Sequence, residues 1–223
     1  LQAIVDGFER RPGAGSIASK MLLFDQRKVF HTAGDFYSVG GLPGNRGVWQ
    51  QDIGQYDQEE PVFSACGGAA AYRRSMLDEI GFLDDDFFFS CEDVDLAWRA
   101  HLSGWQVIYE PSAVVYHKLK ASGDAGVNSS YYDGRNFLYL LWKNYPSGLL
   151  RRNWKAILRV QLKISSDALR SWRGAAARAR LRGQLAVLIG VLKMLPKRRN
   201  IQAKRQVDDE TLMSLLTPVD ETT

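Results

Sequence analysis

Residues 90–117 read SCEDVDLAWRAHLSGWQVIYEPSAVVYH, and this stretch indicates the class of fold. The apolar spacing from Glu92 to Leu102 predicts a helix. Two short apolar runs follow, Gln106–Tyr109 and Ala113–His117, and we expect them to be two strands separated by a turn at Pro111. A helix that leads into strands in this way is typical of α/β proteins.

Outward from this stretch, the pattern stays mixed before it and becomes helical after it. Residues 33–60 are rich in Gly, Asp and Gln, so we expect a long irregular loop there. From Tyr131 onward the apolar spacing is helical, with breaks predicted at Pro146 and Pro196. Before residue 90 we expect three further elements: a helix at Leu1–Arg10, a short strand at Ser16–Phe24 and a short helix at Arg73–Ile80.

The composition is that of a globular protein. The chain has 223 residues, of which 45% are apolar and 24% charged, which excludes collagen-like and wholly disordered classes. Cys66 and Cys91 are too few for a disulfide framework, so a reducing cytosol is expected. The longest apolar run, Leu185–Leu195, contains Lys193 and is shorter than the roughly 20 residues that span a bilayer. Neither a spanning helix nor a signal peptide is predicted.

Charge divides the sequence into three parts. Residues 1–142 carry a net charge of −7, from 12 Lys and Arg against 19 Asp and Glu. Residues 143–205 carry +16, because 17 basic residues are opposed by Asp167 alone. Residues 206–223 carry −5. An acidic body with a basic arm predicts a molecule of two functional parts.

Three carboxylates, Glu92, Asp93 and Asp95, fall in the first turn of the predicted helix. One interpretation is structural: Ser90 and Asp93 fit a capping box, and acids near a helix N-terminus complement the helix dipole. The other is chemical, because a carboxylate held ionised at the mouth of a pocket can act as a general base. The spacing alone leaves both open.

Two other candidates carry the same ambiguity. His117 ends an apolar strand, where a histidine is either structural or a metal ligand beside carboxylates. Gly67 and Gly68 mark either a packing site or a close approach of a ligand to the backbone. Cys66 and Cys91 lack zinc-type spacing, and we find no phosphate-binding loop, dinucleotide fingerprint or nucleophile-elbow motif.

Several motifs in this order resemble the second half of a family 2 glycosyltransferase, and the rhamnosyltransferase-like members most closely. They are Gly67-Gly-Ala-Ala-Ala-Tyr-Arg-Arg74, Ile80-Gly-Phe-Leu-Asp84, Phe87-Phe88, Glu92-Asp-Val-Asp-Leu96, Arg99, Gly104-Trp105, Tyr109-Glu-Pro111 and Val115-Tyr-His117. The resemblance runs from about Ala14 to Ser122. It implies a GT-A fold that binds a nucleotide-sugar through a divalent metal, Mg or Mn, and transfers the sugar with inversion.

The resemblance also implies roles for individual residues. Asp93 matches the member of the acidic motif that is the usual candidate base, with Glu92 as the next candidate. His117 matches a histidine that can complete the metal site. Asp95 and Arg99 are expected to brace the helix. A loop bordering the acceptor and the donor sugar is matched by Gly67, Gly68 and Ala69.

One departure changes the expectation for the whole chain. The family's Asp-x-Asp metal motif would lie just before the helix at Leu1, and this sequence has none there. Asp84–Asp86 contains the letters but occupies a structural turn. We therefore expect a truncated, inactive transferase: residues 1–125 as the acceptor-side half of the catalytic domain, 126–205 as a basic amphipathic helical region and 206–223 as an acidic tail.

The expected role is transfer of a sugar, such as rhamnose, to a glycan or lipid-linked acceptor hydroxyl in envelope polysaccharide synthesis. The basic arm, with apolar faces that include Trp154 and Leu158, predicts binding to an anionic membrane surface at the inner face of the cell membrane. Nucleic acid is not an expected partner, since no recognised motif accompanies the charge. The alternative is a non-catalytic module that binds a membrane surface or polyanion.

Overall fold

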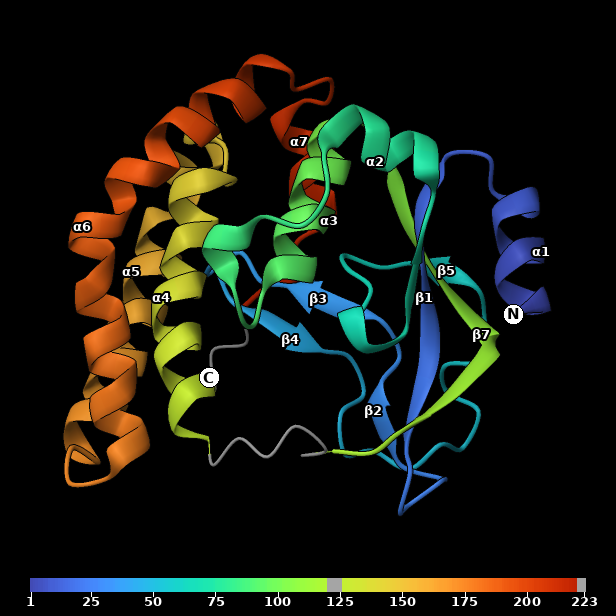
Figure 1. Cartoon of the computed structure of the whole chain (residues 1–223), viewed down its shortest axis with the longest axis horizontal. Helices are drawn as coiled ribbons and strands as arrows, with labels where there is room; N and C mark the ends of the chain where they lie inside the picture. Colours follow the sequence, from blue (N-terminus) through green and yellow to red (C-terminus); the bar gives the residue numbers. More distant parts are fainter. Residues whose placement is uncertain (120–125, 220–223) are drawn as a thin grey trace.

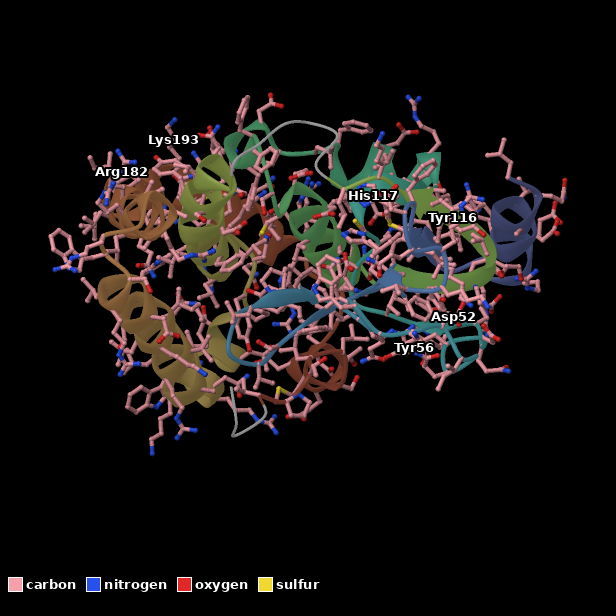
Figure 2. All side chains as sticks on the ribbon, turned by 90° about the horizontal axis from the view of Figure 1, so that it is seen from below. Asp52, Tyr56, Tyr116, His117, Arg182 and Lys193 are labelled. Atoms are coloured by element: carbon pink, nitrogen blue, oxygen red, sulfur yellow. The ribbon has the colours of Figure 1, made fainter. Side chains whose placement is uncertain are left out.

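The computed structural model describes residues 1–119 and 126–219, and it confirms the α/β class (Figure 1). The sheet and α1 (Gln2–Arg10) lie on one side of the molecule, and three long helices lie on the other (Figures 1 and 2). The predicted boundary at residue 125 and the last four residues of the predicted acidic tail fall outside the described residues.

The main sheet is built around β1 (Ala14–Leu23), all ten residues of which are buried. Apart from Lys20, which pairs with Asp52 and Asp57, their small or apolar side chains suit a strand covered on both faces. β1 pairs in parallel with β7 (Gln106–His117) and antiparallel with β2 (Phe30–Thr32) and β6 (Ala70–Tyr72). On its other edge, β7 pairs with β5 (Glu60–Pro61).

Two predictions about strands are wrong. The two strands expected on either side of Pro111 form one strand, β7, because three residues are accommodated where the register against β1 shifts between Ser19 and Lys20. The expected irregular loop at 33–60 contains β5 and a separate hairpin-like pair, β3 (Asp35–Tyr37) and β4 (Pro43–Asn45). Strands of three residues leave too little alternation to be detected from sequence.

The helices agree better with the expected positions. Of two short turns of 3-10 helix, η1 (Gly67–Ala69) lies between β5 and β6, and η2 (Asp85–Phe87) lies between α2 and α3. The remaining helices are α2 (Arg74–Ile80), α3 (Glu92–Leu102), α4 (Val127–Lys143), α5 (Ser147–Arg170), α6 (Ala175–Ala203) and α7 (Asp209–Ser214). Among the described residues, none of these helices has the length and apolar character needed to cross a membrane.

Pro146 precedes α5 as predicted, but the break predicted at Pro196 is wrong. Proline inside a helix removes a hydrogen bond and costs about 3 kcal/mol, so neighbouring contacts must offset it. The next two residues supply them: Lys197 binds Asp84 and Asp86, and Arg198 donates to the carbonyl oxygens of Trp142 and Tyr145.

Glycines let α4 and α6 pack closely. A Cβ added at Gly183 of α6 would lie 2.1 Å from the carbonyl oxygen of Tyr131, and one at Gly134 of α4 would lie 2.4 Å from that of Arg180. Real Cβ atoms do not approach backbone oxygens so closely. The absence of side chains at these positions therefore fixes how near the two helices lie.

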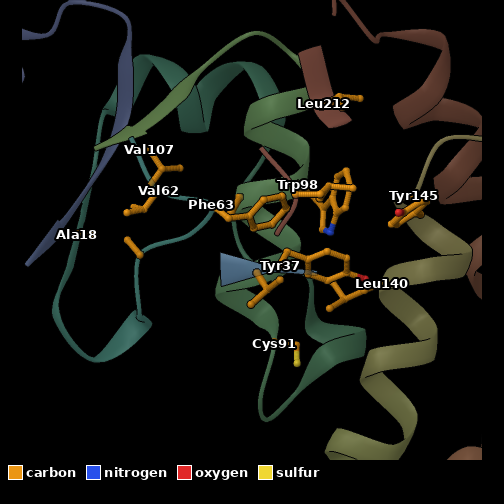
Figure 3. Close-up of a cluster of buried hydrophobic side chains, with 14 of the residues drawn as sticks. Ala18, Tyr37, Val62, Phe63, Cys91, Trp98, Val107, Leu140, Tyr145 and Leu212 are labelled. Carbon is orange, nitrogen blue, oxygen red and sulfur yellow. The ribbon is translucent and has the colours of Figure 1, made fainter. Parts of the chain in front are cut away.

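Buried aromatic rings connect the sheet side to the helices (Figure 3). The indole of Trp98 on α3 lies 5.1 Å from the ring of Tyr37, 5.0 Å from Phe63 and 5.3 Å from Tyr145, measured between centroids. The first two pairs are edge-to-face, a geometry that stabilises a core beyond its buried area, and the third is tilted. Leu212 of α7 joins this cluster, so the predicted acidic tail folds back onto the core in its described part.

A group of buried charges fixes α3 against α4. The carboxylate of Asp95 is fully buried and accepts hydrogen bonds from Lys143 Nζ at 2.6 Å and Arg99 Nε at 3.0 Å. Lys143 Nζ also lies 2.6 Å from Asp84 Oδ2, at the start of η2. Asp95 and Arg99 therefore brace the helix as predicted, and Asp84 has the structural role predicted for it.

We expect Lys143→Met to lower the free energy of unfolding by about 3–5 kcal/mol, because it leaves Asp95 and Asp84 buried with fewer opposing charges. Urea denaturation measures the change. Lys193→Met is the matched control: its side chain is 72% exposed, so a change of no more than about 0.5 kcal/mol is expected. Equal effects of the two substitutions would contradict the role given to the buried network.

Candidate active site

The chain turns sharply just before α3. Phe88, Ser90 and Cys91 all have left-handed backbone conformations, with φ of 48°, 68° and 68°. Non-glycine residues rarely adopt this conformation, and the strain it stores is often found beside functional sites. Asn136 holds the loop in place by donating to the carbonyl oxygens of Phe87, Phe89 and Ser90.

The turn presents Asp93 to a pocket, and backbone groups fix its carboxylate. Oδ2 accepts a hydrogen bond from the N–H of Gly67 at 2.7 Å, and Oδ1 accepts one from the N–H of Val94 at 2.8 Å. The pKa of Asp93 is raised, mainly by burial, although these N–H groups oppose the rise. The capping-box interpretation is wrong, because the hydroxyl of Ser90 donates to Asp133 instead.

Glu92 lies beside Asp93 but is held differently. Its pKa is raised by burial and then by the charge of Asp93. Its Oε2 is buried and has no hydrogen-bond partner among residues 1–119 and 126–219. Of the two acidic candidates, Asp93 is therefore the one with a fixed orientation.

Asp35, which sequence reasoning missed, lies next to Asp93. It is buried at the start of β3, and its Oδ1 accepts from Thr32 Oγ1 at 2.6 Å and Asn45 Nδ2 at 2.9 Å. Burial raises its pKa from 3.8 to about 7, and the charge of Asp93 adds to the rise. One oxygen each of Asp35 and Asp93 and the sulfur of Cys66 all lie within 4.8 Å of one another.

The thiol of Cys66 is not a good metal ligand in this group. Burial, together with the charge of Asp35, raises the pKa of this thiol to about 12. A thiolate is the form that binds metals, and this thiol stays protonated near neutral pH. The group is therefore better described as two carboxylates and a neutral thiol.

These side chains line a pocket of about 300 Å³, which is open to solvent. Pro43, Gly44 and Asn45 of β4 form one wall, and the segment from Ser90 to Val94 forms another. The pocket thus joins parts of the chain that are far apart in sequence. Cys66, Asp133 and Phe137 complete its lining.

The structure brings the predicted glycine loop to this pocket. Gly67 and Gly68 are exposed, and a Cβ at Gly67 would lie 3.4 Å from Asp93 Oδ2. A Cβ at Gly68 would lie 3.3 Å from the terminal methyl of Met21. Together with Ala69 they form η1, which lies beside Asp93 because the Gly67 N–H donates to its carboxylate.

The structure does not bring His117 to the carboxylate group. At the end of β7, its Nδ1 lies 3.3 Å from Nδ1 of His31, which is on β2. Burial, and to a smaller extent the charge of His117, lowers the pKa of His31 to about 4. His31 could not be singled out from sequence, because only the pairing of both strands with β1 makes the two rings neighbours.

No family model matches the sequence. Over 184 residues, 77% of the chain, it is 29% identical to an N-acetylglucosaminyl-diphospho-decaprenol L-rhamnosyltransferase of Mycobacterium tuberculosis. The similarity is the same for the proteins of strain CDC 1551 / Oshkosh and strain ATCC 25618 / H37Rv. The matched part is 57% of these relatives, so the chain spans little more than half of their length.

We expect the free energy of unfolding to fall between pH 5 and pH 8 because Asp35 must ionise while buried. The pKa of Asp35 is higher in the folded protein than in the unfolded chain, so the protonated side chain favours folding. This contribution to the free energy of unfolding is largest below about pH 4 and is lost as the pH rises through 7. Asp35→Asn should reduce the fall by on the order of 1–3 kcal/mol, measured by urea denaturation at both pH values. The exposed Asp85→Asn is the control. Parallel pH curves for wild type and Asp35→Asn would contradict the expectation.

Proposed function

We propose that the chain is the acceptor-side part of an inverting GT-A glycosyltransferase. It would transfer a sugar, such as rhamnose, from a nucleotide-sugar to a lipid-linked or glycan hydroxyl in cell-envelope polysaccharide synthesis. The similarity to a decaprenol-linked rhamnosyltransferase supports this choice of substrates. The observation that carries the proposal is the fixed carboxylate of Asp93, which lies beside two residues without side chains, Gly67 and Gly68.

In this proposal Asp93 is the general base. The acceptor oxygen attacks the anomeric carbon, the bond to the nucleotide diphosphate breaks on the opposite face, and the acceptor proton passes to Asp93. A single displacement inverts the configuration and needs one base. Its raised pKa makes Asp93 a stronger base than an exposed carboxylate, and the two backbone N–H groups keep it oriented.

Asp35 would assist Asp93 without contacting substrate. A protonated Asp35 within 4.8 Å limits the negative charge in the pocket, so Asp93 can hold the one charge that the base requires. Gly67, Gly68 and Ala69 would border the sugar, because the two glycines are exposed and carry no side chain to exclude a hydroxyl-rich ligand.

A divalent metal, Mg or Mn, would be held by His117 with His31 beside it. Two imidazole nitrogens 3.3 Å apart fit a transition ion such as Mn²⁺ better than Mg²⁺, which prefers oxygen ligands. When bound, the ion would offset the negative charge of the departing nucleotide diphosphate. The lowered pKa of His31 supports this role, because a neutral imidazole is the form that binds metal.

We expect Asp93→Asn to lower kcat in the full-length protein by about a hundredfold or more, with nearly unchanged melting temperature. The asparagine oxygen can still accept the hydrogen bond from Gly67, so the loop stays in place. Transfer is assayed with nucleotide-sugars and a polyprenyl-diphosphate-linked acceptor. A larger loss in Glu92→Gln would make Glu92 the base. Full turnover in both variants would rule out both carboxylates as the base, and no transfer by the wild type would favour a non-catalytic module.

His117→Ala should weaken Mn²⁺ binding about tenfold or more, as measured by isothermal titration calorimetry, because it removes one of two nitrogen ligands. His31→Ala should have a similar effect. The neighbouring Tyr116→Ala is the control, since its exposed ring supplies no metal ligand. Superimposable titration curves for wild type and His117→Ala would rule out the ligand role.

A further inference from the structure

The outer face of α6 carries an exposed apolar ridge, which we define as Leu185, Leu188, Ile189 and Leu192. Their exposed fractions are 64%, 74%, 80% and 68%. The spacing of i, i+3, i+4 and i+7 places all four on one side of the helix. The opposite side, which includes Gly183, packs against α4. The ridge therefore stays exposed, because the fold buries only the opposite face of α6.

Basic residues border the ridge, and α6 contains no acidic residue at all. Several of its cations are used inside the molecule: Arg180 pairs with Asp133, and Lys197 pairs with Asp84 and Asp86. Arg182 and Arg199 are exposed and have no ion-pair partner within residues 1–119 and 126–219. Lys193 is 72% exposed, with Asp86 3.9 Å away. Arg182 and Lys193 stand at the outer edge of the helical side in Figure 2.

We propose that this face of α6 lies on an anionic lipid surface, with the ridge in the interface and Arg182, Lys193 and Arg199 at the headgroups. Apolar side chains flanked by cations are what such a surface binds, by burial of apolar area and by attraction to negative lipids. A second copy of the chain is a poorer occupant. Across a two-fold axis the same face meets itself, which brings its cations near those of the partner with no acidic residue on α6 to pair with them.

α6 also reaches the pocket, because its Arg180 pairs with Asp133, one of the residues that line it. Lys197 ties η2 to α6, and Phe88, two residues beyond Asp86, is 78% exposed. Five residues beyond Phe88 the chain reaches Asp93. A lipid-linked acceptor could therefore keep its chain in the bilayer while its sugar reaches the pocket. This last step rests on the proposed function, whereas lipid binding by α6 does not.

The test is co-sedimentation of the full chain with vesicles of phosphatidylglycerol and phosphatidylcholine, compared with vesicles of phosphatidylcholine alone. We expect binding to the anionic vesicles that weakens with salt. The double variant Leu188→Gln, Ile189→Gln should reduce the partition coefficient about tenfold or more, because it removes two exposed apolar side chains and keeps a good helix former. Arg182→Gln with Lys193→Gln should reduce it by roughly as much.

The matched control is Val5→Gln with Ile53→Gln, on α1 and in the loop before β5, whose side chains are 48% and 82% exposed. This control should bind like wild type, and thermal melting verifies that every variant is folded. Unchanged binding by the α6 variants, or an equal loss in the control variant, would overturn the proposal. So would a dimer in analytical ultracentrifugation that the ridge variant dissociates. The co-sedimentation assay contains no substrate. A negative result would therefore overturn lipid binding by α6 and leave the role of Asp93, which is tested by sugar transfer in Asp93→Asn, unaffected.

Discussion

The arrangement of the site depends on one buried carboxylate, Asp95. A fully buried negative charge is tolerated only when its oxygens are saturated by donors, and Lys143, Arg99 and Asn144 supply them. These donors come from α3 itself and from the end of α4. Any displacement of α3 along α4 would leave a charge unpaired in the core, so the helix has one stable position. Asp93 is two residues away, and its place in the pocket follows from that constraint.

The same constraint explains how strain can persist in the loop before α3. Phe88, Ser90 and Cys91 occupy unfavourable backbone conformations, each of which costs on the order of 1–3 kcal/mol. Asn136 and the buried ion pairs hold the two ends of this loop at a distance that a relaxed chain would not keep. The strained turn lets the first turn of α3 present two carboxylates to the pocket. Favourable contacts elsewhere in the fold thus offset the cost of this strained loop, whose backbone conformation does not itself stabilise the protein.

The long elements could be predicted from sequence because their signals are local. The spacing from Glu92 to Leu102 and the proline before Ser147 describe α3 and α5 correctly. The errors arise where distant contacts dominate. Pro196 stays inside α6 because its neighbours are anchored to η2 and α4. Asp35 reaches the pocket, and His31 reaches His117, only through strand pairing. No periodicity in the sequence relates Asp35 to Asp93, so their proximity was not predictable.

The fold also shows that part of the positive charge of the basic arm is neutralised within the molecule. Counted along the sequence, residues 143–205 carry +16, but part of this charge stabilises the fold. Lys143 and Lys197 neutralise acids of the preceding body, and Arg152 and Arg205 pair with Glu210 and Asp209 of the acidic tail. The acidic and basic parts are therefore complementary surfaces within one fold. The positive charge available to a binding partner is that of the cations that point outward. On α6 these cations border the exposed apolar ridge.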